Sequence, residues 1–218
     1  MECQGFLFDL DGTLVDSLPV VERAWCRWAD RFGINHEEVL SFIHGKQAIT
    51  SLRHFMAGRD EADIQREFYA LEKIEAEDTD GVIALPGALA LLEQLNAAGV
   101  PWAIVTSGSL PVASARIRAA GLPEPKVLVT AEQVAKGKPQ PDAYLLGAQR
   151  LALQPEACAV VEDAPAGIEA GLAAGCRVIA VNAPQGTPRL DEVDFAIARL
   201  DALRILPEPG GLTQVETH

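Results

Sequence analysis

Short apolar runs alternate with longer helical patterns along most of this chain, and this alternation predicts βαβ units that build a parallel sheet. Each run is too short for a helix and is followed by turn or capping residues, as is typical of strands buried on both faces. The predicted strands are residues 5–10, 102–106, 126–130, 157–162 and 177–181. Helical patterns at 86–98 and 166–174 end at Gly99 and Gly175. The sequence therefore predicts an α/β fold.

Residues 16–82 interrupt the alternation, because they show helical patterns and no convincing strand. Ser17 is the candidate cap of the first helix, and the acidic run at 60–80 is interpreted as a solvated helix face. An apolar stripe after Ser17 has helical spacing, and we expect it to pack in a core or an interface. The stripe consists of Val21, Trp25, Trp28 and Phe32. We predict an inserted helical domain here, and a frayed end at residues 207–218.

The charge and the cysteines restrict the partners and the compartment. Lys and Arg number 18 and Asp and Glu 31, and the net charge of −13 repels phosphate backbones and anionic membranes. We therefore expect neither a nucleic-acid partner nor a membrane partner, and no apolar run reaches the length of a membrane span. The four cysteines form no CxxC pair and no leader-like segment begins the chain, so we expect free thiols and a cytoplasmic protein.

Acidic pairs follow two of the predicted strands. Asp9 and Asp11 lie at the carboxyl end of the first strand, and Glu162 and Asp163 lie at the end of the fourth. The carboxyl ends of parallel strands share one edge of the sheet, where ligands of open α/β sheets bind. Alone, the first pair is also compatible with a turn and the second with a helix cap. Together, four acids at one edge favour a cation, and hard oxygen ligands favour Mg²⁺.

Polar residues at two further places complete the pattern. Hydroxyls and backbone N–H groups at a helix start can bind phosphate oxygens, although a simple Ser cap would explain the same residues. These residues are Thr106, Ser107, Gly108 and Ser109. Lys138 adds a cation, with an ordinary surface lysine as the alternative. Neither GxGxxG nor GxxxxGK[ST] occurs, so Asp9 remains as a candidate nucleophile that takes a phosphoryl group directly.

The segments FDLDGTL, TSGS, GKPQPD and VVEDAPAG occur in this order and resemble the motifs of the haloacid dehalogenase-like hydrolase superfamily. A helical insert directly after the first strand resembles the branch with phosphoglycolate phosphatase, β-phosphoglucomutase and small sugar phosphatases. The resemblance implies a Rossmann-like core of three α/β/α layers at residues 1–15 and 83–218, and a mobile helical cap at residues 16–82. These two ranges are called the core and the cap.

The resemblance also implies a role for each motif residue. Asp9 matches the nucleophile, and Asp11 matches the acid that protonates the leaving alcohol and then activates water. Thr106, with Ser107 beside it, matches the phosphate-binding hydroxyl, and Lys138 matches the cation that steadies nucleophile and phosphate. The implied Mg²⁺ ligands are Asp9, the backbone carbonyl of Asp11, Asp163 and, directly or through water, Glu162.

Specificity is expected to come from the cap, since the core only holds phosphate. Residues 42–53 resemble, over a short match, the HG-containing cap segment of glycerol- and deoxyhexose-phosphate phosphatases, and a surface turn is the alternative. The residues expected to reach the substrate are His44, Gly45, Lys46 and Gln47, with Gly108 and Ser109 from the core. That subgroup often has Arg where Gln47 stands, so this neutral amide favours recognition of hydroxyl groups.

Together these features favour a Mg²⁺-dependent phosphatase that hydrolyses small sugar or polyol phosphate monoesters through an aspartyl-phosphate. Asp11 supports ester chemistry, because an alkoxide leaves poorly without a proton. A phosphosugar mutase of the β-phosphoglucomutase type is the nearest alternative. A phospho-accepting signalling module is the alternative from another class. The expected partner is a small phosphorylated sugar or polyol, and we expect a monomer or a weak homodimer.

Overall fold

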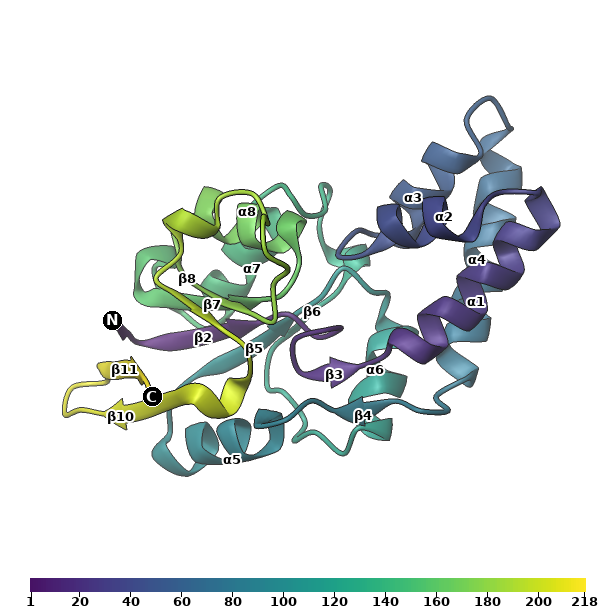
Figure 1. Cartoon of the computed structure of the whole chain (residues 1–218). Helices are drawn as coiled ribbons and strands as arrows, with labels where there is room; N and C mark the ends of the chain where they lie inside the picture. Colours follow the sequence, from purple (N-terminus) through teal and green to yellow (C-terminus); the bar gives the residue numbers. More distant parts are fainter.

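A six-stranded parallel sheet forms the centre of the molecule in the computed structural model, which describes all 218 residues (Figure 1). The strand order is β6-β5-β2-β7-β8-β9, and every neighbouring pair is parallel. In that order the bounds are Leu128–Val129, Trp102–Val105, Gly5–Phe8, Cys158–Glu162, Arg177–Val181 and Phe195–Ile197. All five predicted strands lie in this sheet, which confirms the α/β fold. The short edge strand β9 was not predicted.

Helices cover both faces of the sheet and make three layers. Phe6 and Phe8 of β2 point to the face covered by α5 (Ala88–Ala98) and α6 (Leu110–Ala119). Leu7 points to the opposite face, which is covered by α7 (Asp142–Arg150) and α8 (Pro165–Ala173). Successive side chains alternate along a strand, so an unbroken apolar run such as β2 needs a covered face on each side.

Four further helices lie between β3 (Val15–Asp16) and β4 (Ile83–Ala84), and Figure 1 shows them projecting from one end of the core. They are α1 (Leu18–Phe32), α2 (His36–Ile43), α3 (Ala48–Phe55) and α4 (Glu61–Glu77). They enclose a separate apolar cluster that contains Trp25 and Trp28, as the apolar stripe predicts. Strands β3 and β4 pair antiparallel, so the chain enters and leaves the cap side by side. The domain boundaries at 15/16 and 82/83 stay a prediction.

The two ends of the chain meet in a second sheet, which corrects the expectation of a frayed end. Strands β1 (Glu2–Cys3), β11 (Thr213–Thr217) and β10 (Leu203–Pro207) form an antiparallel sheet in the order β1-β11-β10. Thr213 and Val215 are buried, and the N-terminal amine donates to the Val215 carbonyl at 2.8 Å. The alternation of buried and exposed residues was too short to recognise without its partner strands.

Smaller features complete the fold. Four short 3₁₀ turns occur at Ala131–Gln133, Pro155–Ala157, Leu190–Glu192 and Leu200–Ala202. All four cysteines are free thiols, and three of them are buried. None of the helices combines the length and the apolar character that a membrane span requires.

Candidate active site

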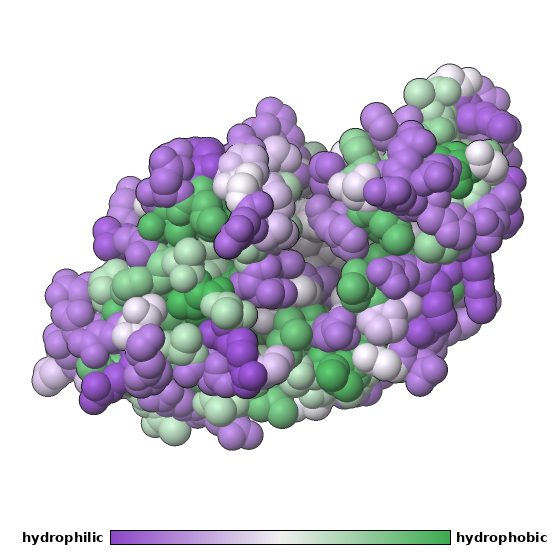
Figure 2. All heavy atoms as spheres, viewed as in Figure 1, coloured by the Kyte–Doolittle hydropathy of each residue, from purple (hydrophilic) through white to green (hydrophobic).

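The acidic residues meet where the strand order reverses. Asp9 follows β2 directly and Asp163 follows β7 directly, and these two strands are neighbours at the centre of the sheet. The crevice at such a reversal is the usual ligand site of open α/β sheets. A cavity of about 700 Å³ opens there between core and cap, and Figure 2 shows the hollow between the two parts. Asp9 lines this cavity, although only 6% of it is exposed.

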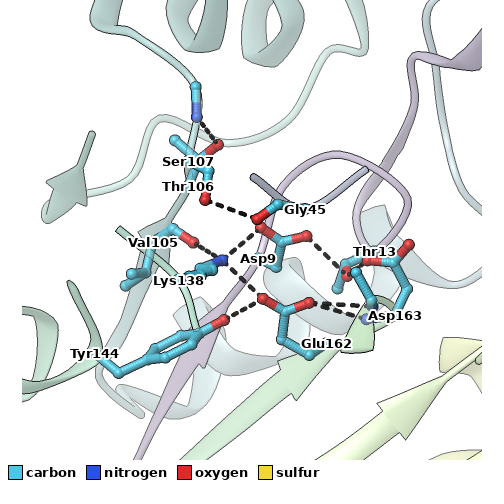
Figure 3. A network of polar contacts seen from close by, with 12 residues as sticks. Asp9, Thr13, Gly45, Val105, Thr106, Ser107, Lys138, Tyr144, Glu162 and Asp163 are labelled. Carbon is cyan, nitrogen blue, oxygen red and sulfur yellow. Dashed lines mark hydrogen bonds and ion pairs between the residues drawn. The ribbon is translucent and has the colours of Figure 1, made fainter. Parts of the chain in front are cut away.

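Lys138 ties two of the acids together beneath the cavity (Figure 3). Its Nζ donates to Asp9 Oδ1 at 2.8 Å, to Glu162 Oε1 at 2.7 Å and to the Val105 carbonyl at 3.0 Å. Burial alone would lower the pKa of Lys138, but Asp9 and Glu162 outweigh it and raise the pKa. The side chain therefore stays an ammonium ion at neutral pH.

Glu162 is surrounded by donors. Its Oε1 also accepts from the Tyr144 hydroxyl at 2.6 Å, and its Oε2 accepts from the backbone N–H groups of Asp163 and Ala164 at 3.2 and 3.3 Å. Figure 3 shows Tyr144 and Lys138 pointing toward the same carboxylate oxygen. The carboxylate is thus fixed beneath the start of α8, with 1% of the residue exposed.

Asp9, Glu162 and Asp163 can each direct one carboxylate oxygen to a common point, since these oxygens lie within 4.8 Å of one another. Burial and the nearby Glu162 raise the pKa of Asp9, and burial and Asp9 raise the pKa of Asp163. Thr13 Oγ1 donates to Asp163 Oδ1 at 3.1 Å. The three carboxylates repel one another, and all of their donor atoms are oxygens. Such a set is suited to bind a hard divalent cation, which would offset the repulsion.

Close packing fixes the loop that carries the first acidic pair. Gly12 has a φ of 84°, and a Cβ at this position would lie 2.2 Å from Asp163 Oδ2. Glycine is therefore required both for the turn and for the close approach of the Asp163 carboxylate.

Of the residues predicted to bind phosphate, Thr106 and Ser107 line the same cavity, while Lys138 lies beneath it and does not line it. The Thr106 hydroxyl accepts from the Gly108 N–H at 3.0 Å, just before α6 begins. Ser109 occupies the position before α6, but its hydroxyl makes no capping hydrogen bond and is buried without a partner. A buried hydroxyl of this kind is costly unless a ligand satisfies it. The Ser109 hydroxyl, which lines the cavity, is therefore suited to bind an oxygen of a ligand.

The cap loop at residues 44–47 contacts the core. The Ser107 hydroxyl donates to the Gly45 carbonyl at 3.1 Å, and Gln47 Nε2 donates to the Ala131 carbonyl at 3.4 Å. Lys46 lines the cavity, but its Nζ donates to the Phe42 carbonyl at 2.7 Å and lies 3.8 Å from the Phe42 ring centre. Its ammonium is thus held by the cap itself. His44 also lines the cavity.

Gly45→Ala is expected to hold the cap loop away from the core. Gly45 has a φ of 75°, and a Cβ there would lie 2.8 Å from the Ala164 Cβ. We expect kcat/KM for a sugar phosphate to fall by about 10-fold or more, because the cap loop can no longer close over the substrate. Gly58→Ala is the control, because Gly58 has a similar φ of 86° but meets no atom within 4 Å. Equal losses in the two variants would exclude the contact with Ala164 as the cause.

Asp11 is held by two side chains that had no predicted role at the site. Its Oδ1 accepts from the Ser17 hydroxyl at 2.7 Å and from Arg116 Nη1 at 2.9 Å. Ser17 was expected to cap α1, but its hydroxyl makes no capping hydrogen bond. Arg116 Nη2 also lies 3.3 Å from Glu75 Oε1, on cap helix α4. Sequence reasoning missed Arg116 and Glu75 here, together with Thr13 and Tyr144.

The comparisons with known proteins agree with this geometry. A family model described as haloacid dehalogenase-like hydrolase matches residues 3–175. Hexitol phosphatase A of Escherichia coli (strain K12) is 68% identical over 211 residues, which cover 97% of this chain and 98% of that protein. Glycerol-1-phosphate phosphohydrolase 2 of Saccharomyces cerevisiae is 36% identical over 188 residues, or 80% of this chain and 73% of that protein. A solved β-phosphoglucomutase from Clostridium difficile shares the fold, with a TM-score of 0.83 over 93% of each chain and 21% identity.

Proposed function

The chain belongs to the haloacid dehalogenase-like hydrolase family, and we propose that it is a Mg²⁺-dependent phosphatase acting on hexitol phosphates and related small sugar or polyol phosphates. The observation that carries the proposal is the buried Asp9 paired with Lys138 beneath the cavity. The identity to hexitol phosphatase A directs the choice of substrate. Hydrolases of this family use a divalent metal ion, and the acids at the site suit one.

The first half of the proposed reaction transfers the phosphoryl group to the protein. An Asp9 carboxylate oxygen attacks phosphorus, and the bond from phosphorus to the alcohol oxygen breaks. Asp11 gives its proton to the departing oxygen, so the product leaves as an alcohol. The Thr106 hydroxyl holds a phosphoryl oxygen during the transfer, and Lys138 keeps the Asp9 carboxylate in place through its hydrogen bond.

The second half restores Asp9. Asp11, now a carboxylate, takes a proton from water while that water attacks phosphorus, and the bond to Asp9 breaks to release phosphate. The ion would be held by Asp9, Asp163 and the Asp11 backbone carbonyl. When bound, it offsets the negative charge of the acids and the phosphate. We assign Glu162 the task of aligning Lys138, because four donors already occupy its oxygens.

A panel of phosphate monoesters tests the proposed function. The purified protein with Mg²⁺ is given hexitol, hexose and glycerol phosphates, a nucleotide and a sugar bisphosphate, and kcat/KM is determined from phosphate release. We expect hexitol phosphates to rank first and the bisphosphate to rank low. Isomerised sugar phosphate without phosphate release would identify a mutase, and no turnover of any sugar or polyol phosphate would refute the proposal.

Asp163→Asn is expected to stabilise the metal-free protein and to abolish its response to Mg²⁺. Because the pKa of Asp163 is raised in the folded state, the contribution of this group to the stability of the wild type falls as pH rises above about 4, the pKa of an unfolded Asp. At pH 7.5 in chelator, the variant should melt about 3 °C or more above the wild type, and the difference should shrink toward pH 4.

Calorimetry with and without Mg²⁺ tests the second half of this expectation. Added Mg²⁺ should raise the melting temperature of the wild type and of the control Asp191→Asn, whose carboxyl is exposed. It should leave Asp163→Asn almost unchanged. An equal Mg²⁺ response in all three proteins would place the ion elsewhere.

A further inference from the structure

Arg116 links the cap to Asp11, the proposed general acid. It lies on α6 of the core, and its Nη1 donates to Asp11 Oδ1 at 2.9 Å. Its Nη2 donates to Glu75 Oε1 at 3.3 Å, and Glu75 lies on α4 near the end of the cap. One guanidinium therefore links two carboxylates, which come from the catalytic loop and from the cap.

This arrangement is buried, which sets it apart from the surface ion pairs of the chain. The side chains of Arg116 and Glu75 are 5% and 9% exposed, while the exposed pair of Arg53 and Glu61 keeps more than half of each side chain in solvent. Taking a guanidinium and a carboxylate out of water is costly unless each has a partner. The network is costly to bury, and it includes the proposed general acid. Packing alone therefore does not account for it.

The geometry at Asp11 shows what the network does. Ser17 and Arg116 both hold Oδ1, and no other side chain bonds the remaining oxygen, Oδ2. Two donors on one oxygen fix the carboxyl plane and direct the other oxygen. Oδ2 is thus the oxygen left from which Asp11 can give a proton to the leaving alcohol.

We propose that Arg116 is a positioning residue that, anchored by Glu75 of the cap, orients the Asp11 carboxyl for protonation of the leaving alcohol. This inference rests on the proposed function, because it takes Asp11 as the general acid. Arg116 borders the cavity, but both of its Nη groups are directed to carboxylates of the protein itself, and only its Nε lacks a hydrogen-bond partner.

A series of aryl phosphates separates this role from a general structural one. Phenyl phosphate and p-nitrophenyl phosphate have nearly the same shape, but p-nitrophenolate leaves without a proton and phenolate benefits from one. The quantity kcat/KM covers only the steps up to departure of this group. For Arg116→Met, we expect kcat/KM to fall about 30- to 100-fold with phenyl phosphate and less than about 3-fold with p-nitrophenyl phosphate.

Two further variants sharpen the test. Arg118→Met removes an exposed arginine two residues later on the same helix, and it should leave both substrates unaffected. Arg116→Lys keeps the charge but cannot span two carboxylates, so the loss with phenyl phosphate should be intermediate. This variant also gives the answer if Arg116→Met does not fold. Equal losses on both aryl substrates in the Lys variant would overturn the proposal.

Melting temperatures measured in the absence of metal test whether Glu75 anchors Arg116. In chelator, Arg116→Met should lower the melting temperature, because it leaves Glu75 buried without a partner. Glu75→Gln combined with Arg116→Met should melt above Arg116→Met alone. Additive effects of the two changes would mean that Glu75 and Arg116 do not act together, and would overturn the anchoring.

The outcomes distinguish a failure of this inference from a failure of the proposed function. If hexitol phosphates are poor substrates but the aryl series shows the expected contrast, the function is wrong and the role of Arg116 stands. If Arg116→Met loses activity on hexitol phosphates but not on phenyl phosphate, Arg116 contacts the polyol, and the positioning role is wrong.

Discussion

Replacing Asp9 with Asn is expected to lower phosphate release by about 10⁴-fold or more, whichever monoester proves best. The amide has nearly the same shape as the carboxylate but cannot attack phosphorus, so no aspartyl-phosphate forms. Folding should survive, because the change removes a buried charge whose pKa is raised by burial and by Glu162. Phosphate release and the melting temperature in chelator are measured on the same preparation.

Asp191→Asn is the matched control, since it makes the same chemical change at an exposed position outside the acidic cluster. It should keep full activity. Mass spectrometry of the protein quenched during turnover should show added phosphate on the wild type and the control, and none on Asp9→Asn. Asp9→Asn that turns over at the parent rate would refute the covalent mechanism.

Replacing Lys138 with Met is expected to be the most destabilising single change at the site. It leaves the carboxylates of Asp9 and Glu162 buried without their shared cation, and breaking a buried ion pair in this way costs about 3–5 kcal/mol. Activity should fall as well, because no cation holds the nucleophile. Denaturant unfolding in chelator measures the loss, and Lys136→Met, at an exposed lysine nearby, should cost little.

The pH dependence of this loss has a definite sign. The raised pKa of Lys138 keeps the wild-type ammonium charged from pH 5 to 9, so its own titration contributes no slope there. In the variant, uncompensated acids bind protons more tightly in the folded than in the unfolded state, so the deficit should grow as pH rises from about 5 to 8. Adding Glu162→Gln should recover part of the stability and none of the activity. A deficit that shrinks with rising pH would contradict the ion-pair account.

Much of the fold followed from local sequence patterns. Five strands of the central sheet are apolar runs bounded by turn residues, and such runs can be recognised without knowing their neighbours. Asp9 and Asp163 were expected to meet because both follow parallel strands. The order of the strands brings these two ends next to each other, and the sequence carries no direct sign of that order.

The missed residues depend on partners that are distant in the chain. Ile64, Phe68, Leu71 and Glu75 share one face of α4 at helical spacing, so an acid stands at the end of an apolar stripe. Arg116 has a similar place beside Ile117 on the buried face of α6. A charged residue on an apolar helix face indicates that it has a buried partner. Only the packing of α4 on α6 shows that Glu75 and Arg116 are partners of each other. The ends of the chain escaped prediction for the same reason, since β11 needs β1 from the opposite terminus.

The pairing of β1 with β11 has a practical consequence for work with this protein. Both termini lie at the end of the molecule away from the cap, as Figure 1 shows, because strand β2 runs from that end toward Asp9. An affinity tag, a fluorescent fusion or a surface linker attached at either terminus therefore stays clear of the entrance used by small molecules. Protein immobilised through either terminus would present that entrance to the surrounding solution.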